Sequence, residues 1–586
     1  MCGIAGIMAA DGAAVDERTL ASLAEALAHR GPDGRGIYRQ DGVGLVHTRL
    51  AIIDLLTGDQ PLVGPDGLAL VANGEIYNHV ELREELAGVA FATGSDCEPP
   101  LALYQRHGLD FSARLRGMYA IALHDRRRRR LVLCRDPFGI KPLYYAETAG
   151  AFVFASELQA ILATGLVARQ LRREARDELL NLQFTTGAET MFAGIRRLLP
   201  GEIIAVEAVR IVERRRLDAL PEGGCDHRDK ADALSELDRV MMESVLLHQR
   251  SDVPYGMFLS GGIDSSVLLA LMARLNPRPV LAFTARFPGA AVPDESAHAR
   301  QVAEAAGAEH VEVDVGEGDF WSLLPAIAER VDDPVADYAV LPTYKLAAEA
   351  RRSVKVILSG EGGDELFGGY GRYRGAMRPW PLTRPMRRRS HFAGLGVLRD
   401  ESMAWRAAYA EVDRRERHRP GRTPLQVAQA VDCADWLPND LLVKLDRCLM
   451  AHGIEGRVPF LDPMVAALAY RLPDGMKVHR QLGKWLLRSW LARILPISKP
   501  FSRKRGFTVP VEEWIARRPH LGGLLAAQPG IQEICRPGSV QALFRQPDKR
   551  TGFAAWTLLF YALWHRSHVA GLKPQGDVFE TLSSKG

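Results

Sequence analysis

The chain has 586 residues, which is too long for one hydrophobic core, so we expect two or more domains. A hydrophobic content of 47%, a charged content of 25% and a net charge of +4 exclude disordered, fibrous and membrane classes and give no reason to expect a nucleic-acid partner. The seven scattered cysteines form no CxxC pair, which argues against a disulfide framework or a zinc site.

The first 205 residues consist of short apolar segments separated by Gly, Pro and Asp, which predicts a strand-dense α+β domain. We expect strands within 44–54, 68–71, 119–125, 131–135 and 152–156, and helices over 16–28 and 80–86. The basic run 126–130 lies between two apolar stretches, which favours a solvated hairpin turn over a binding patch. We place this domain at 2–208 and a charged, Gly-bearing linker at 209–232.

From residue 233 the pattern changes to apolar strands followed by helices: 256–259 then 265–275, 280–287 then 297–306, and 354–358 then a Gly-rich loop. This alternation predicts a parallel α/β sheet in a domain spanning 233–570, with a helical C-terminal part and a polar tail at 571–586. The apolar run 553–564 is too short to cross a bilayer and is interpreted as a core helix.

Cys2 becomes the N-terminal residue if the initiator Met1 is removed. Its α-amine, with an ordinary pKa of about 7.7 to 8.0, could then accept the proton of its own thiol, as in other N-terminal nucleophiles. The start of the chain has no positively charged n-region, so it is a poor signal peptide and we expect a cytoplasmic protein. A lone Cys at position 2 is weak evidence, and the motifs that follow decide its meaning.

Four ordered motifs follow Cys2: His29-Arg30-Gly31-Pro32-Asp33, His47-Thr48-Arg49-Leu50, Asn73-Gly74-Glu75-Ile76-Tyr77-Asn78 and Gly94-Ser95-Asp96-Cys97-Glu98. With them the sequence resembles the class II glutamine amidotransferases. The resemblance implies an N-terminal-nucleophile fold of layered αββα type, in which Cys2 attacks the glutamine side-chain amide. It also implies an oxyanion hole from Asn73 and Gly74, and a glutamine site that comprises Arg49, Leu50, Asn73, Gly74, Glu75 and Asp96. For Arg49 and Asp96 the alternative is a purely structural ion pair.

A Ser/Gly-rich loop, Leu259-Ser260-Gly261-Gly262-Ile263-Asp264-Ser265-Ser266, lies between an apolar strand and an apolar helix. Small residues let the backbone approach a phosphate, and the helix presents its N-terminal N–H groups to the anion. The Gly-Lys-Ser/Thr ending of a Walker A loop is absent. The loop resembles that of ATP pyrophosphatases, which implies an ATP site formed by Leu259, Ser260, Gly261, Gly262, Asp264, Ser265, Ser266, Ala285, Ser359 and Gly360, with Asp264 as a Mg²⁺ ligand. A generic Ser/Gly turn is the alternative.

A second Gly-rich loop spans 359–370 after an apolar strand. The resemblance implies that Asp364 is a second Mg²⁺ ligand and that Glu361 lies where the acceptor meets ammonia. Lys504 occupies the family position that steadies departing pyrophosphate, although a lysine in so basic a stretch could also be a surface residue. The segments 444–447 and 457–462 also match family signatures, and we expect them to shape the acceptor side and the neighbouring core.

Both halves together resemble the glutamine-hydrolysing asparagine synthetases over nearly the whole chain. This implies ATP-dependent adenylation of a carboxylate, most simply that of aspartate, hydrolysis of glutamine at Cys2, and transfer of ammonia through an internal channel. The expected ligands are glutamine, ATP, Mg²⁺ and the acceptor; a homodimer is compatible with the family, and no nucleic acid or membrane is expected.

The acceptor region departs from the family pattern. Tyr338 and Ala339 stand where relatives carry Pro and Ser, and the segments 448–453 and 456 also differ. These differences are explained either by neutral changes in packing or by an acceptor other than aspartate, such as a secondary-metabolite or cell-envelope precursor. A catalytically inactive regulatory homologue is a further alternative, which the joint presence of all the expected site residues disfavours.

Overall fold

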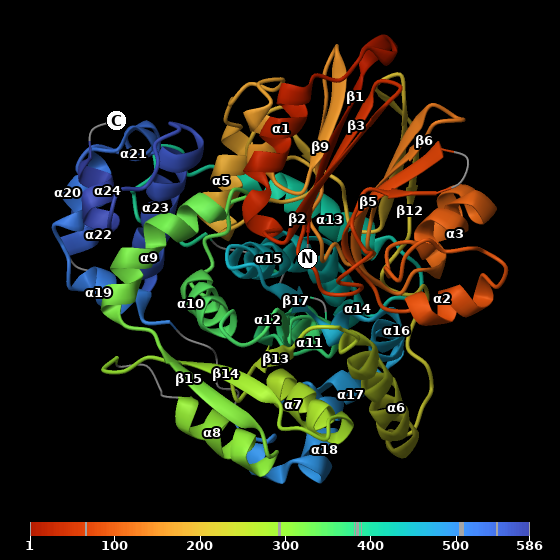
Figure 1. Ribbon diagram of the computed structural model, residues 1–586. Helices are drawn as coiled ribbons and strands as arrows, with labels where there is room; N and C mark the ends of the chain where they lie inside the picture. The colour runs from red at the N-terminus through yellow and green to blue at the C-terminus, as the bar shows by residue number, and fades with distance from the viewer. Residues whose placement is uncertain are drawn as a thin grey trace.

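The computed structural model describes residues 2–64, 67–290, 295–379, 381–382, 386–387, 390–502, 509–545 and 549–584. An N-terminal half rich in strands packs against a larger half that contains a smaller sheet and most of the helices (Figure 1).

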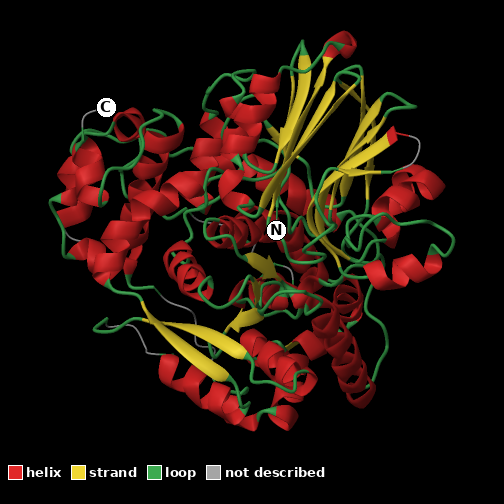
Figure 2. Cartoon of the chain, in the orientation of Figure 1, coloured by secondary structure: helices red, strands yellow, loops and turns green. Residues whose placement is uncertain are grey.

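The N-terminal half contains two antiparallel sheets that lie face to face (Figure 2). In spatial order, the first sheet consists of β10 (Arg196–Arg197), β8 (Tyr144–Glu147), β9 (Ala151–Ala155), β1 (Gly3–Ala9), β3 (Val43–Arg49) and β2 (Gly34–Gln40). The second consists of β12 (Arg210–Arg216), β11 (Glu202–Glu207), β7 (Arg130–Arg135), β6 (Gly117–Asp125), β5 (Leu68–Ile76) and β4 (Leu62–Val63).

Helices cover the outer face of each sheet. Helices α1 (Glu17–Ala26) and α4 (Leu158–Ala163) pack on the first sheet, while the apolar side chains of α2 (His79–Glu85) and α3 (Pro99–His107) share a core with the second. A third core lies between the sheets and includes Ile4, Leu45, Val71 and Phe154. The predicted αββα layering is therefore confirmed. Helix α5 (Arg173–Leu182) follows, and β12 lies at the start of the segment in which we expected the linker.

The second half is built on a parallel sheet in the order β15 (Glu309–Asp314), β14 (Leu281–Arg286), β13 (Tyr255–Phe258), β16 (Val356–Leu358) and β17 (Glu455–Arg457). The chain moves outward in one direction from β13 to β15 and in the other from β16 to β17. The strand order therefore reverses between β13 and β16, and open α/β sheets bind ligands at such a switch point, beyond the carboxyl ends of the strands. The predicted parallel α/β sheet is confirmed.

Helices surround this sheet and make up the C-terminal region, as expected, and one further helix forms within 571–586, where we expected only a polar tail. They are α6 (Lys230–His248), α7 (Ile263–Leu275), α8 (Ser296–Ala305), α9 (Glu317–Arg330), α10 (Val340–Ala350), α11 (Gly363–Leu366), α12 (Gly371–Ala376), α13 (Ala407–Arg417), α14 (Pro424–Val431), α15 (Leu442–Met450), α16 (Pro463–Arg471), α17 (Asp474–Lys477), α18 (Trp485–Ile494), α19 (Val511–Ala516), α20 (Leu521–Ala526), α21 (Pro529–Ile534), α22 (Ser539–Arg545), α23 (Lys549–His568) and α24 (Val578–Ser583). A π-helical segment, Asp432–Leu441, joins α14 to α15, and a short hairpin pairs β18 (Val478–His479) with β19 (Leu482–Gly483).

Helix α23 contains the apolar run 553–564 and is a core helix. Its Trp556 and Trp564 are fully buried, and their ring N–H groups donate to the carbonyls of Ala336 and Asp332 at 2.7 and 3.1 Å. The helix thereby fixes the segment that leads into the expected acceptor region. Within the described part of the chain, no helix is both long and apolar enough to span a membrane.

Candidate active sites

Cys2 lies immediately before β1. Its backbone N–H donates to Oδ1 of Asn73 on β5 at 3.1 Å, and its Sγ lies 4.0 Å from the Leu50 carbonyl. Burial raises the pKa of the thiol, so a proton acceptor is needed to activate it. Asn73 is fully buried, and its Nδ2 has no hydrogen-bond partner among the described residues. A buried amide donor without a partner beside a thiol is the arrangement that an oxyanion would fill.

Gly74 follows Asn73 in β5 where the strand runs close to β6. A Cβ at position 74 would lie 2.0 Å from the Met118 carbonyl oxygen, so only glycine fits without moving the strands. The close approach of β6 therefore requires glycine at the position directly after Asn73.

Two buried carboxylates, Glu75 and Asp96, lie near the same strand end. Asp96 Oδ2 accepts the Ile76 N–H at 2.7 Å. Burial raises the pKa of both acids, and the Asp96 charge raises that of Glu75 further. Glu75 Oε2 has no hydrogen-bond partner among the described residues. Such a pair favours a cationic ligand, for example an α-ammonium group.

The guanidinium of Arg49, at the end of β3, lies within the same half. It donates to Asp59 Oδ1 at 2.8 Å and to the Asp54 carbonyl at 2.5 Å. The Asp59 side chain is 78% exposed, so the ion pair is weak and a carboxylate ligand can replace it at little cost.

A cavity of about 540 Å³ opens at the switch point of the parallel sheet. Of the residues expected at the ATP and metal sites, those that line it are Leu259, Ser260, Gly261, Gly262, Asp264, Ser265, Ala285, Ser359, Gly360 and Asp364. Glu361 lines it too, whereas Ser266 is buried inside α7 and does not. The sheet thus brings together two loops that are about 100 residues apart in sequence, as the carboxyl ends of parallel strands do.

The first of these loops has the form of an anion cradle. Gly261 has a φ of +68°, and Gly262 is the N-cap of α7 without any side-chain cap. The backbone N–H groups at the start of this helix therefore face the cavity end, where a phosphate would find both donors and the positive end of the helix dipole.

Lys484, which sequence analysis missed, connects the two expected metal ligands. Its Nζ contacts Asp264 and lies 2.8 Å from Asp364 Oδ1. Burial alone would lower the pKa of Lys484, but the two carboxylates outweigh burial and raise it. The two acids thus converge on one cation, and two hard oxygen donors also suit Mg²⁺, which is usually held by one or two carboxylates and substrate phosphates. No cluster of three or more metal-ligating side chains occurs among the described residues.

The other end of the cavity is bounded by α10, α15 and the π-helical segment. Lys444 pairs with Asp337 at 2.7 Å, and Glu361 Oε2 is buried without a hydrogen-bond partner among the described residues. Tyr338 and Trp436 add aromatic surface to the lining. Lys504 lies outside the described residues, so its predicted position relative to the cavity stays a prediction.

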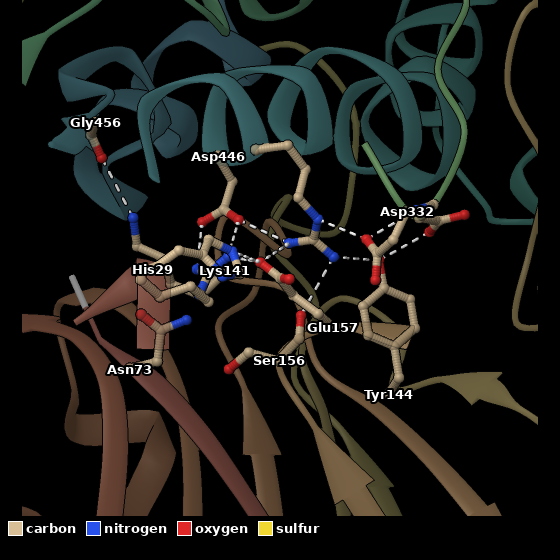
Figure 3. Close-up of polar contacts among 12 residues, drawn as sticks. His29, Asn73, Lys141, Tyr144, Ser156, Glu157, Asp332, Asp446 and Gly456 are labelled. Atoms are coloured by element: carbon tan, nitrogen blue, oxygen red, sulfur yellow. Dashed lines mark hydrogen bonds and ion pairs between the residues drawn. The ribbon is translucent and has the colours of Figure 1, made fainter. Parts of the chain in front are cut away.

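A band of buried ion pairs joins the two halves (Figure 3). The figure shows Glu157 from the N-terminal half and Asp446 and Asp332 from the other half in this band, and Lys141 donates to the Gly456 carbonyl at 3.2 Å. In the segments 444–447 and 457–462, which match family signatures, Lys444 lines the cavity. Asp446, Arg447 and Arg457 instead contact the N-terminal half, at Arg30, the Ser156 carbonyl and Glu75 respectively.

Comparison with known proteins divides the chain into two parts that correspond to the two halves of the structure. The family model described as glutamine amidotransferase domain matches residues 1–216, and the one described as asparagine synthase matches residues 236–566. A putative glutamine-hydrolyzing asparagine synthetase of Mycobacterium tuberculosis is 37% identical over 96% of this chain and 97% of its own. Glutamine-hydrolyzing asparagine synthetase 1 of Bacillus subtilis is 31% identical over 97% of both chains. Amidase chyE of Penicillium rubens is 30% identical, over 82% of this chain and 83% of its own.

Proposed function

Because the chain belongs to the glutamine-hydrolysing asparagine synthetase family, we propose that it converts aspartate to asparagine with ATP and the amide nitrogen of glutamine. The products are asparagine, glutamate, AMP and pyrophosphate. The strongest structural support is the buried Nδ2 of Asn73 next to Cys2, which has no hydrogen-bond partner in the part of the chain that the structure describes, together with the cavity at the switch point of the other half.

In the glutamine half, the Cys2 thiolate attacks the side-chain amide carbon after its own α-amine takes the thiol proton. Asn73 Nδ2 and the Gly74 N–H donate to the oxyanion, the C–N bond breaks, ammonia leaves, and water hydrolyses the thioester to glutamate. Arg49 binds the α-carboxylate of glutamine, while Glu75 and Asp96 bind its α-ammonium group, which relieves the repulsion between these two acids.

In the second half, the loop 259–266 holds the phosphates of ATP at the N-terminus of α7. Asp264 and Asp364 would hold Mg²⁺, which when bound neutralises phosphate charge. A carboxylate oxygen of the acceptor attacks the α-phosphorus, and pyrophosphate leaves. Lys484 and Lys504 balance the charge of the departing group. Ammonia then attacks the acyl-adenylate near Glu361, the C–O bond breaks, and AMP leaves.

We propose that ammonia travels inside the protein between the two sites. The buried interface between the halves supports this route, since Arg30, Asp446 and Arg447 there are almost inaccessible to solvent. In water at neutral pH ammonia would be protonated and lose its nucleophilicity. The second candidate keeps this chemistry with another carboxylate acceptor, and it is favoured by Tyr338 and Trp436 in the cavity lining and by a relative named as an amidase.

The test is to incubate the purified protein with ATP, Mg²⁺ and glutamine, with or without aspartate, and to measure pyrophosphate and the products by mass. Aspartate-dependent pyrophosphate together with asparagine supports the proposal. Glutamate release without aspartate-dependent pyrophosphate moves the acceptor to another carboxylate. Intact-mass analysis tests the nucleophile, because fully active protein that retains Met1 would exclude the α-amine of Cys2 as its base.

A further inference from the structure

The carbonyl of Cys2 is held by a side chain that the mechanism above does not use. Arg30, at the end of a 3₁₀ turn after α1, is fully buried, and its Nε donates to the Cys2 carbonyl at 3.1 Å. The Cys2 N–H is held by Asn73 at 3.1 Å. The backbone of the nucleophile is thus fixed on both sides, so the place of Sγ depends on Arg30.

Arg30 is in turn oriented from the other half of the chain. Its Nη1 and Nη2 donate to the two carboxylate oxygens of Asp446 at 2.8 and 2.9 Å, and Nη1 also donates to Glu157 at 2.8 Å. A two-pronged guanidinium–carboxylate pair fixes the plane of the guanidinium as well as its distance. Glu157, which contacts Nη1 alone, cannot fix that plane by itself.

Asp446 belongs to α15, which also reaches the acceptor end of the cavity. Lys444, two residues earlier, pairs there with Asp337. Arg447, the next residue, donates to Asp332 at 2.8 Å and to Asp446 at 2.8 Å. The helix therefore carries one charged group at the cavity and two at the interface, and it is anchored at both places.

We propose that Asp446 is a positioning residue for glutamine hydrolysis: it holds Arg30 on the Cys2 carbonyl, so that the second half of the chain completes the nucleophile's surroundings in the first. The inference rests on the proposed role of Cys2 as the nucleophile. It also gives a function to the Asp446 carboxylate, which is almost wholly buried although it touches neither reacting centre.

The experiment compares Asp446→Asn with the matched control Asp333→Asn in the full chain. Asp333 is equally buried and also receives a two-pronged guanidinium across this interface, from Arg197 at 2.8 and 2.6 Å, and its other side-chain partner is Tyr144. Both variants lose one buried charge of the same kind. They differ in that Asp446 binds Arg30 and Asp333 does not. Asp446 also accepts from the neighbouring Arg447 at 2.8 Å, but Asp446→Asn leaves the bond from Arg447 to Asp332 in place.

We expect Asp446→Asn to lower kcat for glutamate release about 100-fold, the size of effect that misplacing a reacting group by about 1 Å can have, with KM for glutamine changed less than about 3-fold. Cys2 alkylation by iodoacetamide should slow in the same variant. Asp333→Asn should keep kcat within about 3-fold. Equal losses in both variants, or an unchanged kcat in Asp446→Asn, would overturn the positioning role.

If Asp446→Asn does not fold, Arg30→Lys tests the other member of the pair. It keeps the charge but removes both the two-pronged bond to Asp446 and the Nε bond to the Cys2 carbonyl, so an unchanged kcat in Arg30→Lys would likewise overturn the proposal. The unaltered protein and Cys2→Ala serve as the check on the proposed function. Absence of glutamate release from the unaltered protein, or its persistence in Cys2→Ala, would overturn the nucleophile assignment itself. Glutamate release by the unaltered protein and by Asp333→Asn, but not by Cys2→Ala, supports that assignment, so a loss in Asp446→Asn then reports on positioning.

Discussion

The side-chain amide of Asn73 is divided between two tasks: Oδ1 accepts the Cys2 N–H at 3.1 Å, and the buried Nδ2 has no partner among the described residues. The bond to Cys2 fixes which way the amide faces. The donor is therefore oriented before any substrate arrives, and its desolvation has already taken place during folding.

Asn73→Ala is expected to lower kcat for glutamine hydrolysis about 10²- to 10³-fold, because one oxyanion donor is worth about 3 to 4 kcal/mol. Asn73→Asp is the matched variant: it keeps an acceptor for Cys2 but loses the donor. Glutamate release should fall as far in Asn73→Asp as in Asn73→Ala, and an Asp variant with normal kcat would remove Nδ2 from the mechanism.

Lys484→Gln should have opposite effects on metal binding and on catalysis. Without the ammonium group, Asp264 and Asp364 lose their shared internal cation, so we expect Mg²⁺ to bind the protein about 10-fold more tightly when ATP is absent. Pyrophosphate release should nevertheless fall, because the departing group loses a positive charge. Calorimetric titration with Mg²⁺ measures the first effect, and unchanged Mg²⁺ affinity would argue against a shared site.

Gly369→Ala tests the contact between Asp364 and Lys484 by steric overlap, without removing a charge. A Cβ at this position would lie 1.9 Å from Asp364 Oδ1 and 2.3 Å from Lys484 Cε, so the side chains must separate. Gly475→Ala is the control, since nothing lies within 4 Å of a Cβ there. We expect pyrophosphate release to fall at least 10-fold in Gly369→Ala only, with glutamate release retained in both. Equal activity in the two variants would show that the Asp364–Lys484 contact is dispensable.

Glu178 predicts a specific pH dependence of stability. Burial raises its pKa to about 7, although the Thr186 N–H, which donates at 2.8 Å, opposes this shift. Between about pH 4.5 and 7 the folded state holds a proton that the unfolded state has released, so the free energy of unfolding falls as pH rises through this window and stays lower above it. The shift corresponds to about 3 kcal/mol as an upper bound.

Glu178→Gln should therefore raise the urea midpoint relative to the unaltered protein at pH 8 and leave it nearly unchanged at pH 4.5. Glu174→Gln, on the same helix but with an exposed side chain, is the control. If Glu178→Gln shifted the midpoint equally at both pH values, the effect would come from packing and not from the titration of this carboxyl.

Cys2, Asn73 and the loop 259–266 can be predicted from sequence because each belongs to a short contiguous motif with a local backbone requirement. The parallel sheet can be predicted too, since each strand is followed by a helical period. Lys484 is different: it meets Asp264 across 220 residues, and nothing in Gly483-Lys484-Trp485 specifies that contact. The pair Arg30–Asp446 spans 416 residues and depends on how the halves pack, so sequence patterns place its members on their elements but do not bring them together.

The segment from α15 to β17 bears on how such enzymes can be recombined. Although it lies deep in the second half of the chain, Asp446, Arg447 and Arg457 all contact the first half. A chimera that takes its N-terminal domain from one relative and the remainder from another, cut between the domains, would therefore separate each of these charges from its native partner. Exchanging residues 442–457 together with the N-terminal domain keeps these contacts between the two halves matched, although Lys444 and Arg447 must then pair with Asp337 and Asp332 of the other relative. The segment that belongs structurally with the first domain is thus separated from it in the gene.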